Sequence, residues 1–133
     1  MQIDLDLMKK MLNVFIESPK AFITLAEIES AVSDGEAFIF HIGLMLDNKL
    51  ITGVDFESTP ASVGLVVANT RILTRPLRVR LSQQGHDFAV MLNQQPILEK
   101  LKEQAKQAPM DVLVAIGKAW GRKLISRHLD LDI

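Results

Sequence analysis

The residues of this chain that could do catalytic chemistry are few. The sequence holds three histidines, His41, His86 and His128, and no cysteine. Ser82, His86 and Asp87 formally offer a nucleophile and a base, but they fall within one turn of a predicted helix, where Ser82 is better explained as a cap. No two histidines stand at metal-binding spacing, and no phosphate-binding loop or dinucleotide fingerprint occurs. We therefore expect no enzyme, no cofactor and no metal.

The basic residues offer a different chemistry, the binding of an anionic partner. Four arginines fall within ten residues: Arg71, Arg75, Arg78 and Arg80. Guanidinium groups on an exposed strand can contact phosphates or enter the minor groove of DNA. Together with Lys49 they form the candidate DNA-binding residues. The alternative is a solvated strand face that pairs with the acidic half of the chain, and both interpretations stay open.

Charge is divided unevenly along the chain, although the net charge is only −1. Residues 1–70 carry ten acidic and four basic residues, a balance of −6, whereas residues 71–133 carry six acidic and eleven basic residues, a balance of +5. This division indicates a surface with two poles. A second basic face, either an ordinary solvated helix face or a phosphate-contacting surface, is formed by Lys118, Arg122, Lys123 and Arg127.

Helical signals dominate the first part of the chain. Apolar residues recur every three or four positions over residues 4–18, which predicts an amphipathic helix. Thr24 and Glu27 form a capping box for a short second helix. Ser33 or Asp34 should cap a third helix that ends shortly before Lys49.

The second part begins with extended segments and ends with helices. Residues 49–54 and the alternating residues 77–81 predict two strands, of which the second has one charged face. Residues 55–76 are the least regular stretch. The apolar residues from Val63 to Val67 could form a strand, but Gly64 and the lack of clean alternation argue against one. Ser82 should cap a helix through residue 92, with Gly85 permitting close packing in its first turn. Two more helices follow, at residues 97–107 and from Pro109 onward.

This order of elements predicts a mainly α fold of the α+β class. We expect a winged helix-turn-helix with a two-stranded wing over residues 1–93, followed by two additional C-terminal helices over residues 94–133. At this length the chain can bury one core. The C-terminal extension could pack on the same domain or on a second subunit, and the sequence leaves that choice open.

The third helix argues against the usual way of reading DNA. A recognition helix should present Arg, Lys, Asn or Gln to the base edges. This helix instead offers Glu36, Phe40 and Asp47 among apolar residues. We therefore expect it to be deeply packed or to form an interface, so that any DNA contact depends on the arginines.

Three segments resemble a family of small bacterial and prophage winged-helix proteins that is described only as a domain of unknown function. They are the opening helix at residues 4–12, the aromatic-His helix with its closing Leu-Ile pair at residues 40–51, and the Leu-Ser-x-x-Gly-His-x-Phe step at residues 81–88. Lys49 stands where winged helices often have Gly. The resemblance implies a winged-helix fold and a DNA-binding regulator on a prophage or mobile element; it implies no activity and no site residues.

Two hypotheses for the function remain. The first is a DNA-binding protein, similar to a transcriptional regulator, that binds double-stranded DNA through the arginine cluster. The second is a winged-helix module for protein–protein interaction or homodimerisation without DNA binding, which the apolar third helix favours. In both cases the absence of a long apolar run predicts no membrane span, and we expect a cytoplasmic protein.

Overall fold

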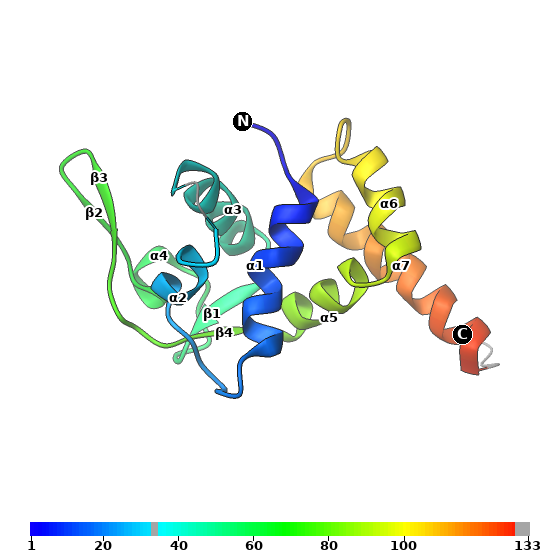
Figure 1. Ribbon diagram of the computed structural model, residues 1–133, viewed down its shortest axis with the longest axis horizontal. Helices are drawn as coiled ribbons and strands as arrows, with labels where there is room; N and C mark the ends of the chain where they lie inside the picture. The colour runs from blue at the N-terminus through cyan, green and yellow to red at the C-terminus, as the bar shows by residue number, and fades with distance from the viewer. Residues whose placement is uncertain (33–34, 130–133) are drawn as a thin grey trace.

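The fold is described from a computed structural model, which covers residues 1–32 and 35–129 and, within the last helix, leaves out the side chains at positions 125 and 127–129. This part of the chain is of the α+β class, as expected, with short strands between helices (Figure 1). The helices are α1 (Leu5–Glu17), α2 (Leu25–Glu29), α3 (Gly35–Asp47), α4 (Pro60–Val63), α5 (Gln83–Leu92), α6 (Gln95–Gln104) and α7 (Met110–Leu129). The strands are β1 (Ile51–Gly53), β2 (Leu65–Ala68), β3 (Arg71–Thr74) and β4 (Val79–Leu81).

Side chains cap the starts of α1 and α5, and the cap of α5 is the predicted Ser82. Asp4 accepts a hydrogen bond from the backbone N–H of Leu7 at 3.1 Å and begins α1. Ser82 accepts one from the backbone N–H of Gly85 at 3.0 Å and begins α5. These bonds satisfy donors that the first turn of a helix leaves free. The predicted caps of α3, at positions 33 and 34, lie outside the described residues.

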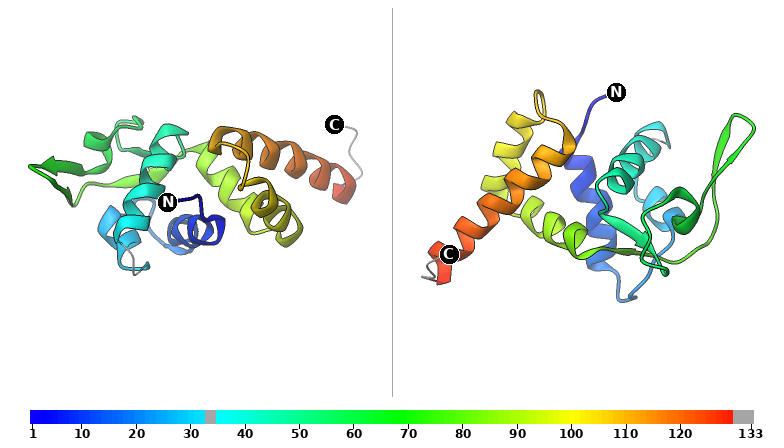
Figure 2. Two further views of the ribbon diagram at one scale, coloured as in Figure 1. Left: turned by 90° about the horizontal axis from the view of Figure 1, so that it is seen from above. Right: turned by 180° about the vertical axis from the view of Figure 1, so that it is seen from behind.

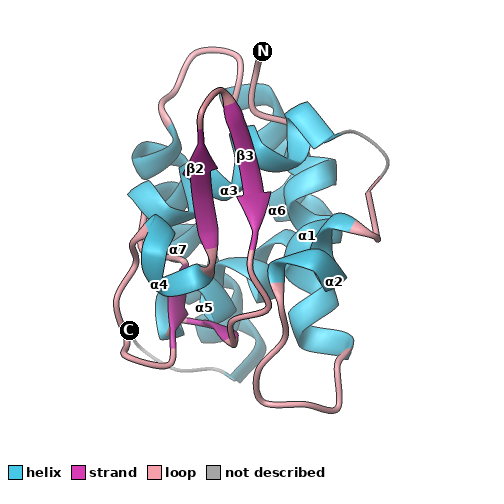
Figure 3. Cartoon of the chain, turned by 90° about the vertical axis from the view of Figure 1, so that its left-hand side faces the viewer, coloured by secondary structure: helices cyan, strands magenta, loops and turns pink. Residues whose placement is uncertain are grey.

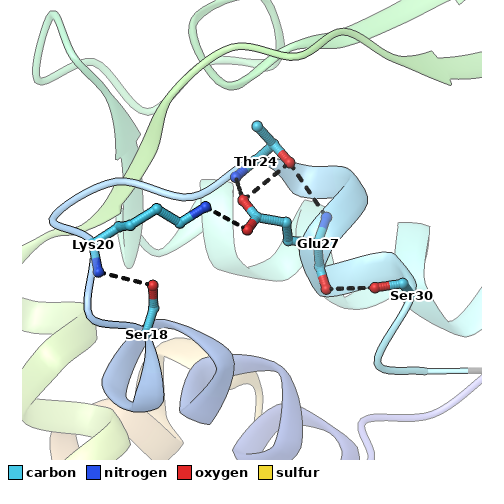
Figure 4. A network of polar contacts seen from close by, with 5 residues as sticks. All are labelled: Ser18, Lys20, Thr24, Glu27 and Ser30. Carbon is cyan, nitrogen blue, oxygen red and sulfur yellow. Dashed lines mark hydrogen bonds and ion pairs between the residues drawn. The ribbon is translucent and has the colours of Figure 1, made fainter.

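The capping box of α2 also holds a basic side chain (Figure 4). The Glu27 carboxylate accepts from the backbone N–H of Thr24 at 2.7 Å and pairs with the Lys20 ammonium at 2.7 Å. The hydrogen bond from Lys20, followed by the one from the Thr24 backbone, holds the pKa of Glu27 below its usual value. The ammonium group of Lys20 is therefore already paired with a carboxylate of the same chain.

The described part of the chain forms two small antiparallel sheets. Strands β1 and β4 pair with Thr52 opposite Arg80, and an isolated bridge joins Ile23 to Val79 on the other side of β4. Strands β2 and β3 form a separate hairpin with Val67 opposite Ile72. Residues 55–76 thus contain α4 and a hairpin, where the sequence showed no regular pattern, and the strand expected at 77–81 begins only at residue 79.

One core joins the beginning and the end of the chain. Buried side chains of α1, such as Met8 and Leu12, belong to the same cluster as Leu101 of α6 and Leu113 of α7. An ion pair of 2.9 Å between Asp6 and Lys102 links α1 to α6 at the surface. The two C-terminal helices therefore pack on α1 and α5 of the same chain, and the core crosses the expected boundary at residues 93–94.

Glycine makes one close approach in this core possible. Gly85, in the first turn of α5, lies so close to the Leu50 backbone that a Cβ atom would stand 1.9 Å from the Leu50 carbonyl oxygen. The close packing expected at Gly85 is confirmed. It fixes the start of α5 against the segment that joins α3 to β1.

The hairpin stands apart from this body. It projects on the side of the molecule opposite to α7, as two views show (Figures 1 and 2). Seen from its own side, it lies in front of the helices (Figure 3). The arrangement separates a helical body from a two-stranded arm.

Candidate nucleic-acid interface

The arginine cluster lies on the hairpin arm and on its return to the body. Arg71 begins β3 opposite Ala68, next to the two-residue turn Asn69–Thr70, whose first residue has a positive φ of 57°. Arg75 follows β3, and Arg78 precedes β4. All three side chains are exposed, and none has an ion pair or hydrogen bond to a residue that the structure describes. Their charges are available to a partner.

A glycine closes the base of the arm. Gly64 has a φ of 91°, in the left-handed region, and its carbonyl oxygen accepts a hydrogen bond of 2.7 Å from the backbone N–H of Arg75. A Cβ atom at this position would lie 2.5 Å from the Arg75 carbonyl oxygen. Only glycine fits both the backbone conformation and the space. This contact sets the point at which the two strands leave the body.

Arg80 differs from the other three arginines because its side chain is used inside the fold. Its guanidinium group donates a hydrogen bond of 3.3 Å to the Thr52 hydroxyl and lies 4.7 Å from the centre of the Phe56 ring. Phe56 is held at a φ of 64°, which bulky residues rarely adopt. Arg80 therefore stabilises the turn after β1, and its guanidinium group is engaged within the fold, unlike those of Arg71, Arg75 and Arg78.

Lys49, the fifth candidate, lies away from the arm. It follows α3 with a φ of 55°, in the left-handed region that glycine adopts more readily than lysine. Its carbonyl oxygen accepts a hydrogen bond of 2.6 Å from the Ser82 hydroxyl. Because Ile51 pairs with Leu81 at this end of the sheet and Gly53 pairs with Val79 at the other, Lys49 and the arm lie at opposite ends of the β1–β4 pair.

The exposed side of α3 carries no positive charge. Phe38, Ile42 and Met45 are fully buried, as expected for a deeply packed helix. Its exposed charged side chains are the carboxylates of Glu36 and Asp47. Carboxylates repel phosphates, so α3 is unsuited to the major groove.

His41 has a structural role, because both of its ring nitrogens form hydrogen bonds within the fold. Its Nε2 atom accepts a hydrogen bond of 2.9 Å from the backbone N–H of Asp4, and its Nδ1–H donates one of 2.7 Å to the carbonyl oxygen of Ala37. The side chain is buried and ties α3 to the start of α1. The Ser82 hydroxyl is likewise used by the fold, since it caps α5 and donates to Lys49.

The second basic face lies at the far end of the molecule. The Lys118 ammonium donates a hydrogen bond of 2.8 Å to the Gln84 side chain and so links α7 to α5. Arg122 and Lys123 are exposed, whereas the side chain of Arg127 lies outside the described residues. Because α7 and the hairpin project in opposite directions (Figure 1), the two basic sets do not form one continuous surface.

Two features of the arm were missed by sequence patterns. Between Glu57 and Asp87 the chain has no acidic residue, and all four clustered arginines fall in this interval. Within it, the hairpin exposes apolar side chains on both faces, with Val67 71% exposed, Leu73 50% and Ile72 46%. The sequence signal that could have indicated the arm is an apolar segment without acidic residues that a turn interrupts. The arm is therefore both cationic and apolar.

Comparison with known proteins finds no matching family, no matching curated protein and no matching solved structure. The family resemblance of the three segments therefore stays a prediction. In the described part of the chain no helix is both long and apolar enough to cross a membrane. Among the same residues, no three His, Asp or Glu side chains gather as metal ligands would.

Proposed function

We propose that this protein is a winged helix-turn-helix protein that binds double-stranded DNA by contacting phosphates with the hairpin arginines Arg71, Arg75 and Arg78. The observation that carries the proposal is the exposure of these three guanidinium groups on a projecting arm without acidic residues. Arginine is suited to phosphates because its planar group donates several hydrogen bonds at a fixed geometry.

The order and pairing of the elements support the winged helix. Helices α1, α2 and α3 precede β1, the hairpin and β4, and Ile23 pairs with the far edge of β4. The hairpin is then the wing, and α3 is the helix in the recognition position. A cytoplasmic location and a regulatory role on a prophage or mobile element belong to the same proposal and rest on the resemblance alone.

Recognition through the wing alone has a consequence for specificity. Phosphate contacts position a protein on the duplex but carry no sequence information. Since α3 presents carboxylates, the protein is expected to bind duplexes of different sequence with similar affinity. The affinity should depend steeply on salt, because each neutralised phosphate releases a counterion.

The test is fluorescence anisotropy of a labelled random duplex at several salt concentrations. Three phosphate contacts predict a log–log slope of about −2.7, or an affinity loss of about 40-fold between about 50 and 200 mM salt. The variant R71A/R75A/R78A should abolish this binding. The control K118A/R122A/K123A removes the same charge from α7 and should leave the slope within about one unit of the parent value. Absence of binding at low salt, or equal loss in both variants, contradicts the proposal.

One observation favours the second candidate function, a protein-interaction module. The exposed apolar residues of the hairpin resemble the centre of a protein interface more than a phosphate-binding surface. Analytical ultracentrifugation over a wide concentration range checks for a homodimer. Under the DNA-binding proposal the protein sediments as a monomer in the absence of DNA.

A further inference from the structure

The outer half of the hairpin exposes an apolar pair. Val67 on β2 and Ile72 on β3 are cross-strand partners, one step before the pair Ala68–Arg71 and the turn. Side chains alternate between the faces of a strand, so Val67 and Ile72 point to the same face. Their exposed fractions are 71% and 46%. Apolar side chains at the outer end of an arm are costly in water and gain free energy when a partner covers them.

The opposite face of the hairpin also carries exposed side chains. It carries Leu73, which is 50% exposed, opposite the half-buried Val66, and Arg71 opposite Ala68 beside the turn. A two-stranded hairpin has little stability of its own, and in this one only the base, at Leu65, packs against the core. Binding of the outer end by a partner would therefore remove apolar surface from water and order the arm.

The charge of the arm indicates the chemistry of the partner. Arg71 stands one position nearer the turn than the apolar pair and on the opposite face of the hairpin, and Arg75 and Arg78 lie toward the base. The interval from Glu57 to Asp87 holds no carboxylate between its ends. A partner that is both anionic and apolar at close quarters suits this arm. The minor groove of DNA has this character, with phosphates along its rims and sugars and base edges within, and narrow A·T-rich grooves attract arginine.

We propose that the hairpin enters the minor groove and acts as a wedge, with Val67 and Ile72 against the base pairs on one face and Arg71, on the opposite face beside the turn, reaching the phosphates at the rim. This inference rests on the proposed DNA binding and adds the groove and the mode of contact. Apolar side chains inserted between base steps are a known means of bending a duplex.

The width of the hairpin makes bending a consequence of entry. Two paired strands are separated by about 4.8 Å, and their side chains add to that width. The minor groove is only about 6 Å wide. Entry therefore widens the groove, and a duplex whose minor groove is widened by a wedge bends toward the major groove.

The test measures bending separately from binding. A duplex of about 30 base pairs, labelled at both ends, reports its end-to-end distance by energy transfer. The parent protein should shorten this distance, and it should bind a duplex made flexible by a central mismatch at least about fivefold more tightly than the intact duplex. The variant V67S/I72S keeps every arginine, so it should keep the salt dependence and lose both effects.

The matched control is V90S/V112S. These two valines on α5 and α7 are 37% and 40% exposed, so the control removes apolar surface of the same kind from the body. It should bend DNA as the parent does. Competition by netropsin, which occupies the minor groove, should displace the parent protein.

The outcomes separate the wedge from the proposed function. Salt-dependent binding without bending, unchanged in V67S/I72S, overturns the wedge and leaves the phosphate contacts standing. Absence of salt-dependent binding by the parent protein overturns both. Self-association of the parent without DNA, lost in V67S/I72S but kept in V90S/V112S, also overturns the wedge and assigns the apolar pair to a protein interface.

Discussion

Helix α3 and the β2–β3 hairpin are built from similar apolar residues, yet they use them in opposite ways. Phe38, Ile42 and Met45 of α3 are fully buried, and the exposed charged groups of that helix are carboxylates. The hairpin exposes Val67 and Ile72 to solvent. The comparison teaches that, in this chain, α3 uses its apolar residues for stability, whereas the hairpin leaves its apolar residues exposed. Substitutions in the two regions should therefore affect different properties.

The largest expected effect is a loss of stability caused by a substitution in α3. Phe38→Ala removes a fully buried ring and should lower the free energy of unfolding by about 3–5 kcal/mol, because it loses transfer free energy and leaves a cavity. The hairpin variant V67S/I72S should change it by about 0.5 kcal/mol or less per site. Urea unfolding followed by circular dichroism measures both. If the free energy of unfolding of the hairpin variant fell by several kcal/mol, the apolar pair of the arm would be packed, and the difference between α3 and the hairpin would not hold.

The second effect concerns the contact that holds the end of α3. Gly85→Ala places a methyl group against the Leu50 backbone and should cost about 3 kcal/mol, because neither backbone can yield easily. Gly43→Ala, in the middle of α3, meets no atom within 4 Å and should stabilise the protein by about 0.5–1 kcal/mol through helix propensity. Thermal unfolding compares the two. Equal effects would contradict the close packing at Gly85.

A smaller effect tests whether Lys49 belongs to the fold or to the binding surface. Lys49→Gly relieves the left-handed backbone and should raise the free energy of unfolding by about 0.5–1 kcal/mol. Because Lys49 lies at the other end of the β1–β4 pair from the arm, the slope of DNA affinity against salt should stay unchanged. A slope that falls by about 0.9 would assign a phosphate contact to Lys49.

The smallest expected effect is on stability at acid pH, and it concerns one carboxylate of the body, Glu27 in α2, and one near the base of the arm, Asp55. A hydrogen bond from Ser62 holds the pKa of Asp55 near the base of the arm below its usual value, as Lys20 does for Glu27 beside α2. A group whose pKa is lowered by folding contributes stability above its unfolded pKa and loses it as the pH falls through the folded value. E27Q and D55N should therefore each flatten the loss of stability between neutral and acid pH.

The same unfolding curves, recorded at neutral pH and at acid pH for the parent and each variant, provide the check. A matched variant is E29Q, at an exposed position of α2. The proposed origin of the acid sensitivity fails if E29Q flattens the profile as much as E27Q does.

The sequence by itself determined the features that depend on neighbouring residues. The cap at Ser82, the capping box at Thr24 and Glu27, and the amphipathic helix α1 follow from hydrogen bonds and periodicity within a few positions. The buried character of α3 was also predictable, because a helix with so few polar residues must pack against something. Local signals of this kind need no knowledge of the rest of the chain.

The tertiary structure alone decided which of the predicted residues can act together. Alternation marks a strand only where one face is buried, so the hairpin, exposed on both faces, gave no such signal. The contacts of Arg80 with Thr52 and Phe56 join residues far apart in the chain. The packing of α6 and α7 on α1 likewise places the second basic face opposite the arm. Such contacts depend on how the elements pack, and spacing along a sequence does not contain that information.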